Sequence, residues 1–340
     1  MDTEVSQTGR EEVAAALRRM GLLGADEACA VTALCGGVSC DVWRVDLEER
    51  AICVKRALPR LRVSEDWRAP ADRSGAEVDW LRLVAGIDPR VVPEVLGEDR
   101  PHHFFAMEYL PPQSHPLWKS ELAAGRADPD FAVRVGAALA RIHAATAGRE
   151  DVAHDFAHGN HFHALRLEPY LLFTAKKHPG AAARIRALAD GIARARIALM
   201  QGDISPKNIL RGPDGPVFLD AETACYGDPA FDLAFCLNHL LLKCAWHRQF
   251  AGRYLSSFRS LADAYLGGVT WEEPEEIAAR TAGLLPALML ARVDGKSPVE
   301  YLAADEDRQA VRAFALARLK ADADSLDAIA GSWAARITSP

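Results

Sequence analysis

The sequence predicts an α+β fold with two unequal lobes, and three observations support this prediction. Short strand-like runs dominate the chain from residue 24 to about residue 110. From residue 129 onward, nearly every segment outside 201–222 has helical periodicity and is rich in alanine and leucine. A proline-rich connector at 111–116, PPQSHP, separates the two textures. Because strands and helices are segregated along the chain, we expect a small strand-rich lobe, a larger helical lobe and a cleft between them.

The first lobe is expected to begin with an amphipathic helix at 10–23, where apolar residues recur at helical spacing before Gly24. The segment 31–47 predicts two strands joined by a glycine turn, and 50–58 predicts a third strand. A helix should follow at 73–86, and strand-like runs follow at 91–99 and 102–110. We therefore place the first domain at 1–112, with a hinge near 107–112, and the second at 113–340.

Composition excludes several classes of function. With 340 residues, 49% of them hydrophobic and 26% charged, the chain can bury a large core. A formal net charge of -7 argues against a nucleic acid partner. Seven cysteines without a C-x-x-C pair favour reduced thiols over disulfides or a zinc ribbon. The acidic N-terminus does not resemble a signal peptide, and the most apolar run, 231–246, contains charged residues. We expect a cytoplasmic protein without a membrane span and interpret 231–246 as a buried helix.

Residues 201–210, QGDISPKNIL, place Asp203 five residues before Asn208, and Asp220 follows at the end of an apolar strand. The oxygen atoms of Asn208 and Asp220 suit Mg²⁺, which prefers hard ligands. Asp203 then stays available to accept a proton from a hydroxyl group. The alternative reading is an ordinary turn, because Asp, Asn, Ser and Pro are common turn residues.

Three features upstream add to this pattern. Gly36 and Gly37 suit a tight turn whose backbone amides can approach phosphate oxygens, although a plain hairpin turn would look the same. Lys55 lies on an apolar strand and faces away from Ile52 and Val54. By its place in the sequence, a helix glutamate, Glu77, can reach Lys55. Taken singly, both charged residues read as solvent-facing, and the fixed order of all these features is what favours a site.

Together the motifs resemble the aminoglycoside phosphotransferase and choline kinase group, whose fold is similar to that of protein kinases. The group's loop usually reads H-G-D-x-x-x-x-N, and here Gln201 replaces the histidine. The segments LDAETACYGDPAFDLA at 219–234 and LARIHAAT at 139–146 are also similar to those of the group. The resemblance runs over roughly residues 28–250 and implies a protein-kinase-like fold, with a nucleotide-binding first lobe and a catalytic second lobe.

The resemblance implies an enzyme that uses ATP and Mg²⁺ to phosphorylate a hydroxyl group of a small molecule. It implies the following roles: Asp203 as the catalytic base; Asn208 and Asp220 as metal ligands; Gly36, Gly37 and Lys55, braced by Glu77, at the ATP phosphates; Glu108 and Leu110 at the adenine; Gln201 and Asp228 as braces of the loop. Glutamine at 201 can still form hydrogen bonds through its amide, so we expect activity to survive this departure.

The acceptor is expected to be a neutral or anionic sugar-like metabolite. The segment 151–200, where this group builds much of its substrate pocket, carries seven Lys and Arg against four acids. Polycationic acceptors would need carboxylates around their amines. The candidate substrate contacts are Arg166, Tyr170, Arg292 and Lys296.

Other functions stay open at this stage. The chain could act on aminoglycosides or choline-like amines, or it could be a catalytically impaired nucleotide-binding regulator. A protein kinase is disfavoured because no A-P-E-like segment follows Asp220. Residues 154–163, HDFAHGNHFH, carry His154, His158, His161 and His163, which could bind zinc, although glycine and asparagine disfavour a helix there. The oligomeric state and the choice between ATP and GTP are not predicted.

Overall fold

The structure is a computed structural model that describes residues 5–34, 39–59, 62, 70–321 and 325–338. The chain divides into two compact units. The first contains residues 1–114 together with 219–222, and the second contains 115–218 and 223–340. The first unit therefore recruits a short segment from far along the chain, and this segment includes Asp220.

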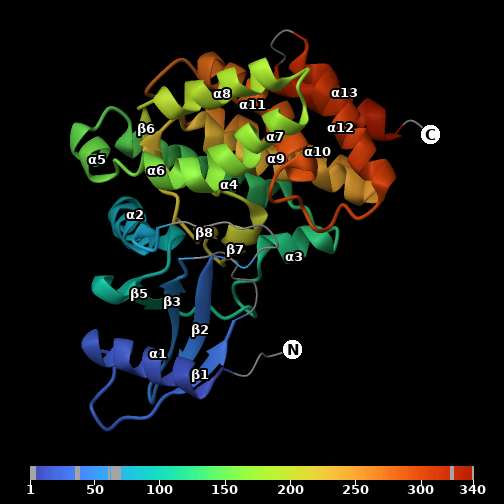
Figure 1. Cartoon of the computed structure of the whole chain (residues 1–340). Helices are drawn as coiled ribbons and strands as arrows, with labels where there is room; N and C mark the ends of the chain where they lie inside the picture. The colour runs from blue at the N-terminus through green and yellow to red at the C-terminus, as the bar shows by residue number, and fades with distance from the viewer. Residues whose placement is uncertain (1–4, 35–38, 60–61, 63–69, 322–324, 339–340) are drawn as a thin grey trace. The chain divides into compact units, whose positions relative to one another are not determined.

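The first unit is built around a five-stranded antiparallel sheet with strand order β1-β2-β3-β5-β4 (Figure 1). Its elements are α1 (Gln7–Arg19), β1 (Ala30–Ala33), β2 (Cys40–Asp46), β3 (Ala51–Ala57), α2 (Arg73–Ile87), β4 (Val95–Asp99) and β5 (Phe104–Glu108).

The two faces of this sheet have different neighbours. Ile52 and Val54 of β3 are buried in a core cluster with Val13 and Leu17 of α1. Successive side chains of a strand point to opposite faces, so Lys55 points to the other face. Helix α2 contacts β3, β4 and β5, and its Glu77 binds Lys55. Strand alternation thus delivers Lys55 to the α2 side of the sheet.

The second unit is mainly helical, with two short two-stranded sheets, β6-β9 and β7-β8. Its elements are α3 (Trp118–Ala123), α4 (Pro129–Thr146), α5 (Glu150–Asp155), α6 (Gly159–Phe162), a π-helical stretch (His163–Leu172), α7 (Phe173–Lys177), α8 (Ala182–Arg194), β6 (Ala198–Met200), β7 (Ile209–Arg211), β8 (Pro216–Phe218), β9 (Cys225–Gly227), α9 (Ala230–Trp246), α10 (Ala251–Leu266), α11 (Pro274–Asp294), α12 (Asp305–Leu319) and α13 (Leu326–Thr338).

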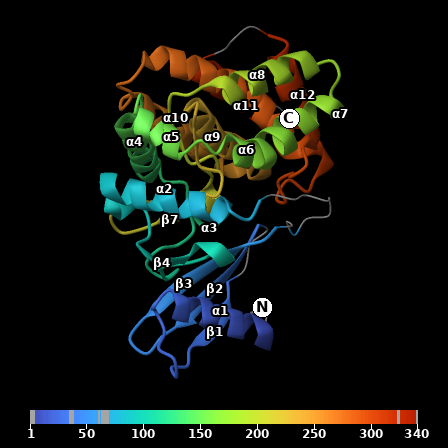
Figure 2. The same ribbon diagram turned by 60° about the vertical axis from the view of Figure 1, so that its left-hand side comes forward.

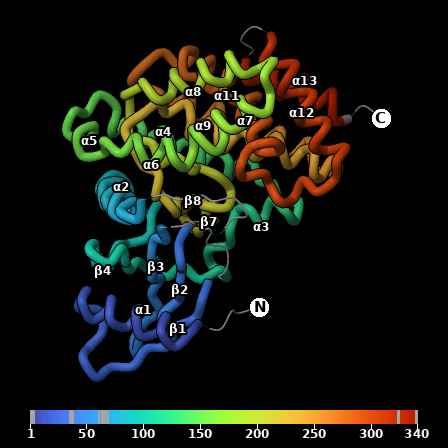
Figure 3. Tube along the Cα trace, in the orientation of Figure 1, coloured from blue at the N-terminus to red at the C-terminus, as the bar shows by residue number. Residues whose placement is uncertain are grey.

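Helix α9 is the centre of the second unit. It lies among α10 and α11, and α10 also packs against α4 (Figure 2). The C-terminal helices α12 and α13 lie side by side and also contact α9 (Figure 3). All residues of α9 from Ala230 to Ala245 are buried. A helix surrounded in this way buries polar side chains as well as apolar ones, and α9 carries Asp232, Asn238, His239 and Lys243.

The expected α+β fold is confirmed, as are a strand-rich beginning and a helical remainder. The buried helix expected at 231–246 is α9. The N-terminal helix differs in its bounds, because Ser6 caps its start and the chain adopts a left-handed conformation at Gly21 (φ 72°). Among the described residues, no helix is long and apolar enough to span a membrane.

Candidate active site

The first unit gathers Lys55, Glu77 and Asp220 into one buried cluster. Lys55 Nζ donates to Glu77 Oε1 at 2.7 Å and Oε2 at 2.9 Å, and to Asp220 Oδ1 at 2.9 Å. The side chains of Lys55 and Glu77 are 6% and 1% exposed. Glutamate at 77 therefore holds a strand lysine in one position, as the sequence order suggested.

Electrostatics keep this lysine charged. Burial alone would lower the pKa of Lys55, but the carboxylates of Asp220 and Glu77 raise it well above its usual value. Burial raises the pKa of Glu77 to about 7, against the opposing effect of the Lys55 ammonium. The result is a fixed cation that can pair with anionic oxygens.

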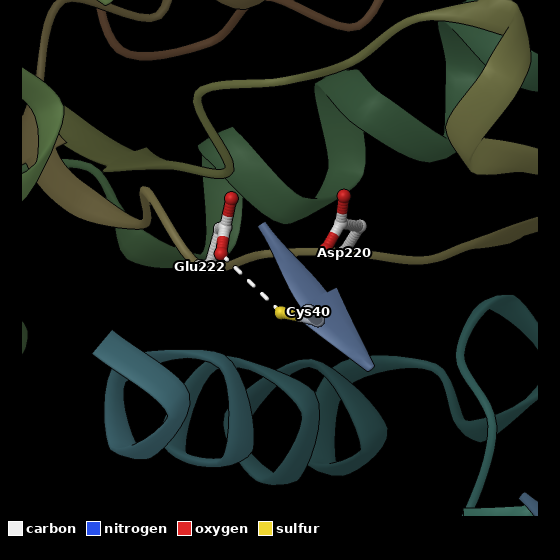
Figure 4. A group of neighbouring side chains, drawn as sticks. All are labelled: Cys40, Asp220 and Glu222. Atoms are coloured by element: carbon white, nitrogen blue, oxygen red, sulfur yellow. Dashed lines mark hydrogen bonds between the residues drawn. The ribbon is translucent and has the colours of Figure 1, made fainter. Parts of the chain in front are cut away.

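Asp220 has an unusual backbone conformation, with φ 64°. A left-handed conformation costs free energy for a residue other than glycine, and such residues gather at functional sites. Figure 4 shows its neighbours Cys40, at the start of β2, and Glu222. One ligand atom from each of the three residues lies within 4.8 Å of the others. Asp220 is thus held in a strained conformation beside a second carboxylate.

The donor set of this group favours a hard cation over zinc. Burial, and then the Glu222 carboxylate, raises the pKa of the Cys40 thiol well above its usual value. Glu222 Oε2 accepts from Arg73 Nε at 2.8 Å, and Arg73 is fully buried. A cysteine binds a metal as the thiolate, so in this group the carboxylate oxygens are the available ligands, and these suit a hard cation.

The second unit holds the loop 201–208. Its backbone is fixed by Asp232 of α9. The Asp232 carboxylate accepts hydrogen bonds from the backbone amide of Gln201 at 2.7 Å and from that of Gly202 at 2.8 Å. The side-chain oxygen Oε1 of Gln201 accepts a hydrogen bond from the backbone amide of Asp203 at 2.6 Å. Gln201 therefore forms a hydrogen bond within the loop through its amide group.

The two carboxylate oxygens of Asp203 have different environments. Oδ2 accepts from Asn208 Nδ2 at 2.8 Å and lies 2.8 Å from Arg166 Nη2 and 2.9 Å from Lys207 Nζ. Oδ1 is buried and has no hydrogen-bond partner among the residues that the structure describes. Three donors therefore orient the carboxylate and leave one oxygen ready to accept a proton.

Arg166 joins the π-helical stretch to this loop. Its Nε donates to Gly202 O at 2.7 Å, and its Nη1 donates to Leu165 O at 2.7 Å. Its guanidinium lies 5.8 Å from the Tyr170 ring centroid and 5.9 Å from that of Phe235. Wide helical turns of this kind are frequent at functional sites. Arg166 thus holds the loop backbone at Gly202 and also forms an ion pair with the Asp203 carboxylate.

Glycine is required at position 202. The residue has φ 81°, and a Cβ there would lie 2.6 Å from Thr223 Oγ1 and 3.0 Å from Thr223 O. Thr223 Oγ1 in turn donates to Gln201 O at 3.1 Å. Any side chain at 202 would disturb both the loop and its support.

We therefore expect Gly202→Ala to lower the free energy of unfolding by roughly 1–3 kcal/mol, because it combines a steric clash with a strained φ. Denaturant titration monitored by circular dichroism measures the change. The matched control is Gly191→Ala in α8, where an added Cβ meets nothing within 4 Å. Alanine in a helix should stabilise that control by about 0.5–1 kcal/mol. Equal stability of the two variants would contradict the proposed constraint.

The other candidate residues lie in three places. Asp228 pairs with Arg280 at 3.0 Å and accepts from Ala230 N at 3.0 Å, which places it at the start of α9. Tyr170 OH lies 3.1 Å from Arg292 Nη1, and both side chains are buried. Lys296 donates its backbone amide to Pro169 O at 2.9 Å. Arg292 and Tyr170 are thus brought together, one contact away from Arg166.

In the first unit, Glu108 ends β5 and is exposed, and Leu110 is half-buried. The backbone amide of Glu108 donates to Glu94 O at 2.8 Å. Gly36 and Gly37 lie outside the described residues.

Two further sequence observations turn out differently. Lys and Arg at 176, 177, 184, 186, 194 and 196 are exposed, so of the seven cations counted in 151–200 only Arg166 is buried. His158 and His161 stack with ring centroids 5.5 Å apart, and His154 is exposed. Within the described ranges, these histidines do not bring three metal-ligand atoms together. The charge count of that segment therefore describes solvated helix faces.

Sequence reasoning missed the residue that fixes the loop. Asp232 is fully buried and also lies 3.4 Å from Nε2 of the buried His143 on α4. The available signal was an acid inside a mostly apolar helix, because a buried charge needs partners. Glu222 was also missed, although it lies two residues after Asp220.

Comparisons with known proteins show the family of this chain. A family model described as "Phosphotransferase enzyme family" matches residues 30–264. Methylthioribose kinase 1 of Oryza sativa subsp. japonica is 27% identical over 230 residues, which cover 59% of this chain and 53% of the rice protein. Methylthioribose kinase of Pectobacterium carotovorum is 28% identical over 217 residues, which cover 56% of this chain and 54% of the bacterial protein. The chain thus spans about half the length of these curated relatives.

A solved structure is similar over most of its length. The choline kinase from Cryptosporidium parvum superposes with a TM-score of 0.54 at 11% identity, over 91% of this chain and 94% of that one. At this identity the likeness shows the fold alone.

Proposed function

Because the chain belongs to the phosphotransferase enzyme family, we propose that it is a kinase that transfers the γ-phosphate of ATP to a hydroxyl group of a small molecule. The family resemblance stated from the motifs is confirmed by the match over residues 30–264. The proposed acceptor is a neutral or anionic sugar-like metabolite, and the relatives named as methylthioribose kinases support an acceptor of this kind.

One observation carries the proposal: Asp203 has one oxygen held by three donors and one buried oxygen without a partner. A general base must be oriented and must also have a free lone pair. In the proposed reaction, the acceptor oxygen forms a bond to the γ-phosphorus and the bond from that phosphorus to the β-γ bridging oxygen breaks. The hydroxyl proton passes to Asp203 Oδ1, and ADP leaves.

Lys55 is the proposed contact of the ATP phosphates, and Glu77 is the residue that holds it. Their distances of 2.7 and 2.9 Å support a lysine fixed in one place before nucleotide arrives. Pre-orientation of this kind is the main protein contribution to phosphoryl transfer. Gly36 and Gly37 at the phosphates, and the backbone of Glu108 and Leu110 at the adenine, remain proposals from the resemblance.

Mg²⁺ is the proposed metal, and Asn208 and Asp220 are its proposed ligands. Nδ2 of Asn208 donates hydrogen bonds to Asp203 O at 3.1 Å and to Asp203 Oδ2 at 2.8 Å. The side-chain oxygen Oδ1 of Asn208 is then available to a cation. Asp220 offers a carboxylate beside Glu222. Bound Mg²⁺ would neutralise phosphate charge, and both residues fit it by their oxygen donors. Gln201 and Asp228 are the proposed braces of the loop and of the start of α9.

A panel of hydroxyl compounds tests the proposal. ADP formation would be measured with Mg-ATP and neutral sugars and polyols, sugar acids and sugar phosphates, and choline-like or kanamycin-like amines. We expect at least one neutral or anionic compound to reach a kcat/KM of about 10⁴ M⁻¹s⁻¹. Equally efficient turnover of a polycation would refute the proposed acceptor class. Nucleotide binding without consumption for every compound would favour a regulator over a kinase.

A further inference from the structure

Lys243, in the last turn of α9, is a buried cation without a hydrogen-bond partner among the described residues. The residue is 1% exposed. Its Nζ lies 4.4 Å from the ring centroid of Tyr301 and 4.9 Å from that of Trp246. The one carboxylate that raises its pKa, Glu300, forms its ion pair with Lys119. Contact with two rings offsets only part of the cost of burying an unpaired ion. The protein alone therefore leaves this charge under-compensated.

His239 and Arg292 also carry buried nitrogen atoms without a partner among the described residues. His239, one turn earlier on α9, places Nδ1 3.4 Å from Tyr301 OH, while its buried Nε2 has no partner in the described part of the chain. Arg292 of α11 donates from Nη1 to Tyr170 OH at 3.1 Å, and its buried Nε likewise has no partner there. Buried polar groups are nearly always hydrogen-bonded, so three such atoms around Tyr301 and Tyr170 suit a ligand that accepts hydrogen bonds.

This cluster is continuous with the proposed base. Tyr170 touches Arg292, and its ring centroid lies 5.8 Å from the Arg166 guanidinium, which pairs with Asp203 at 2.8 Å. On α9, the ring centroids of Phe235 and His239 are 5.6 Å apart, and Phe235 also borders Arg166. A molecule with its hydroxyl at Asp203 would thus have the cluster near its other end.

Neighbouring positive charges contribute to the pKa shifts of three groups in the cluster, in addition to the larger effect of burial. Burial, and then Arg292 and Lys243, lower the pKa of His239 well below its usual value. Burial, and then Lys119, lower the pKa of Lys243 to about 8. Burial alone would raise the pKa of Tyr170, yet Arg292 and Arg166 lower it. A bound anion would oppose the effect of these positive charges on the pKa of all three groups.

We propose that Lys243, His239 and Arg292 form a subsite for a carboxylate or phosphate group of the acceptor, whose hydroxyl reaches Asp203. The inference rests on the proposed kinase function and narrows its acceptor class to anionic hydroxyl compounds. Tyr301 and Trp246 are only half-buried, so a ligand that displaces one ring reaches the ammonium. The source of the anion, carboxylate or phosphate, is distinguished by the experiments below.

The first experiment needs no turnover. The unfolding temperature is measured with rising inorganic phosphate or acetate in a Lys55→Ala background, which removes the proposed nucleotide-phosphate contact. Binding to the folded state raises the unfolding temperature as ligand increases. We expect a saturable rise with at least one anion, its loss in Lys243→Met, and its retention in Lys320→Met, a control at an exposed lysine.

The same experiment separates a ligand role from a structural one. Without anion, Lys243→Met should unfold at an equal or higher temperature, because it replaces an unpaired buried charge by an apolar side chain of similar length. A lower unfolding temperature, or an anion-dependent rise that persists in Lys243→Met, would overturn the proposal. Arg292→Met is the second variant, and it should also lose the rise.

The second experiment uses paired acceptors: gluconate with glucitol, glycerate with glycerol, and ribose 5-phosphate with ribose. The anionic member of at least one pair should have a kcat/KM at least about tenfold higher in the wild type, a difference of ~1.4 kcal/mol. In Lys243→Met this advantage should fall below about threefold, because the anionic member should lose more kcat/KM than the neutral member. A neutral member preferred in every pair would refute the subsite. Anion binding without turnover of any acceptor would instead count against the kinase function.

Discussion

Asp203→Asn is expected to abolish phosphate transfer while leaving nucleotide affinity nearly unchanged. Asparagine keeps the shape of the side chain and can still meet part of the network around Oδ2, but it cannot accept the acceptor's proton. Loss of a general base typically costs about 10²–10⁴-fold in rate. Steady-state kinetics with the best acceptor of the panel, and calorimetric titration with Mg-ATP, measure the two quantities separately.

The matched control for this variant is Asp214→Asn. Asp214 is an exposed acid between β7 and β8, in the same unit and close in sequence. It should retain wild-type kinetics. The role assigned to Asp203 would be wrong if Asp203→Asn kept more than about a tenth of wild-type turnover, a barrier increase below ~1.4 kcal/mol.

Asp220→Ala is expected to remove the magnesium-dependent part of nucleotide affinity. The change deletes a proposed metal ligand, a charged oxygen that nucleotide phosphates cannot replace. Calorimetric titration of ATP with and without Mg²⁺ should give similar affinities for the variant, whereas the wild type binds more tightly with the metal. Lys55→Ala should weaken ATP binding under both conditions, because it removes the proposed phosphate contact and not a proposed metal ligand.

Glu48→Ala is the control for this second set, since Glu48 is an exposed acid in the turn between β2 and β3. It should bind Mg-ATP as the wild type does. An unchanged metal dependence in Asp220→Ala would overturn the ligand assignment. An unchanged affinity in Lys55→Ala would leave the buried Lys55–Glu77 pair as a purely structural feature.

The fold could be predicted because its signals are local. Alternation in β3 predicts a strand whose Lys55 and Ile52 side chains lie on opposite faces of the sheet. The apolar run at 231–246 predicts a buried helix. The error at the first helix is also local in origin: the prediction continued to residue 23, but the helix ends at Arg19. A glycine inside a helical pattern ended it earlier than periodicity suggested.

The candidate site was only partly predictable, because its supports come from distant parts of the chain. Arg166 precedes Asp203 by 37 positions, and Asp232 follows Gln201 by 31, a separation that no spacing rule covers. Arg166 was predicted to contact the substrate, and its ion pair with Asp203 was not predicted. Its place on the carboxylate depends on tertiary packing, which sequence periodicity does not report.

The cationic cluster shows why charge counting along one segment failed. Most cations of 151–200 are exposed. Lys243 and Arg292 are buried, and they lie in helices α9 and α11, outside that segment. Burial, and not sequence density, decides whether a charge can act on a ligand, because solvent screens exposed charges.

The central claim is that this chain moves the γ-phosphate of ATP to a small-molecule hydroxyl with Asp203 as the base. Its most direct test is mass spectrometry of a panel acceptor after incubation with Mg-ATP labelled with ¹⁸O in the γ-phosphate. The account predicts a labelled phosphate monoester of the acceptor with the wild type and none with Asp203→Asn. Label that appears only in inorganic phosphate, or a monoester that forms equally well with both proteins, would contradict it.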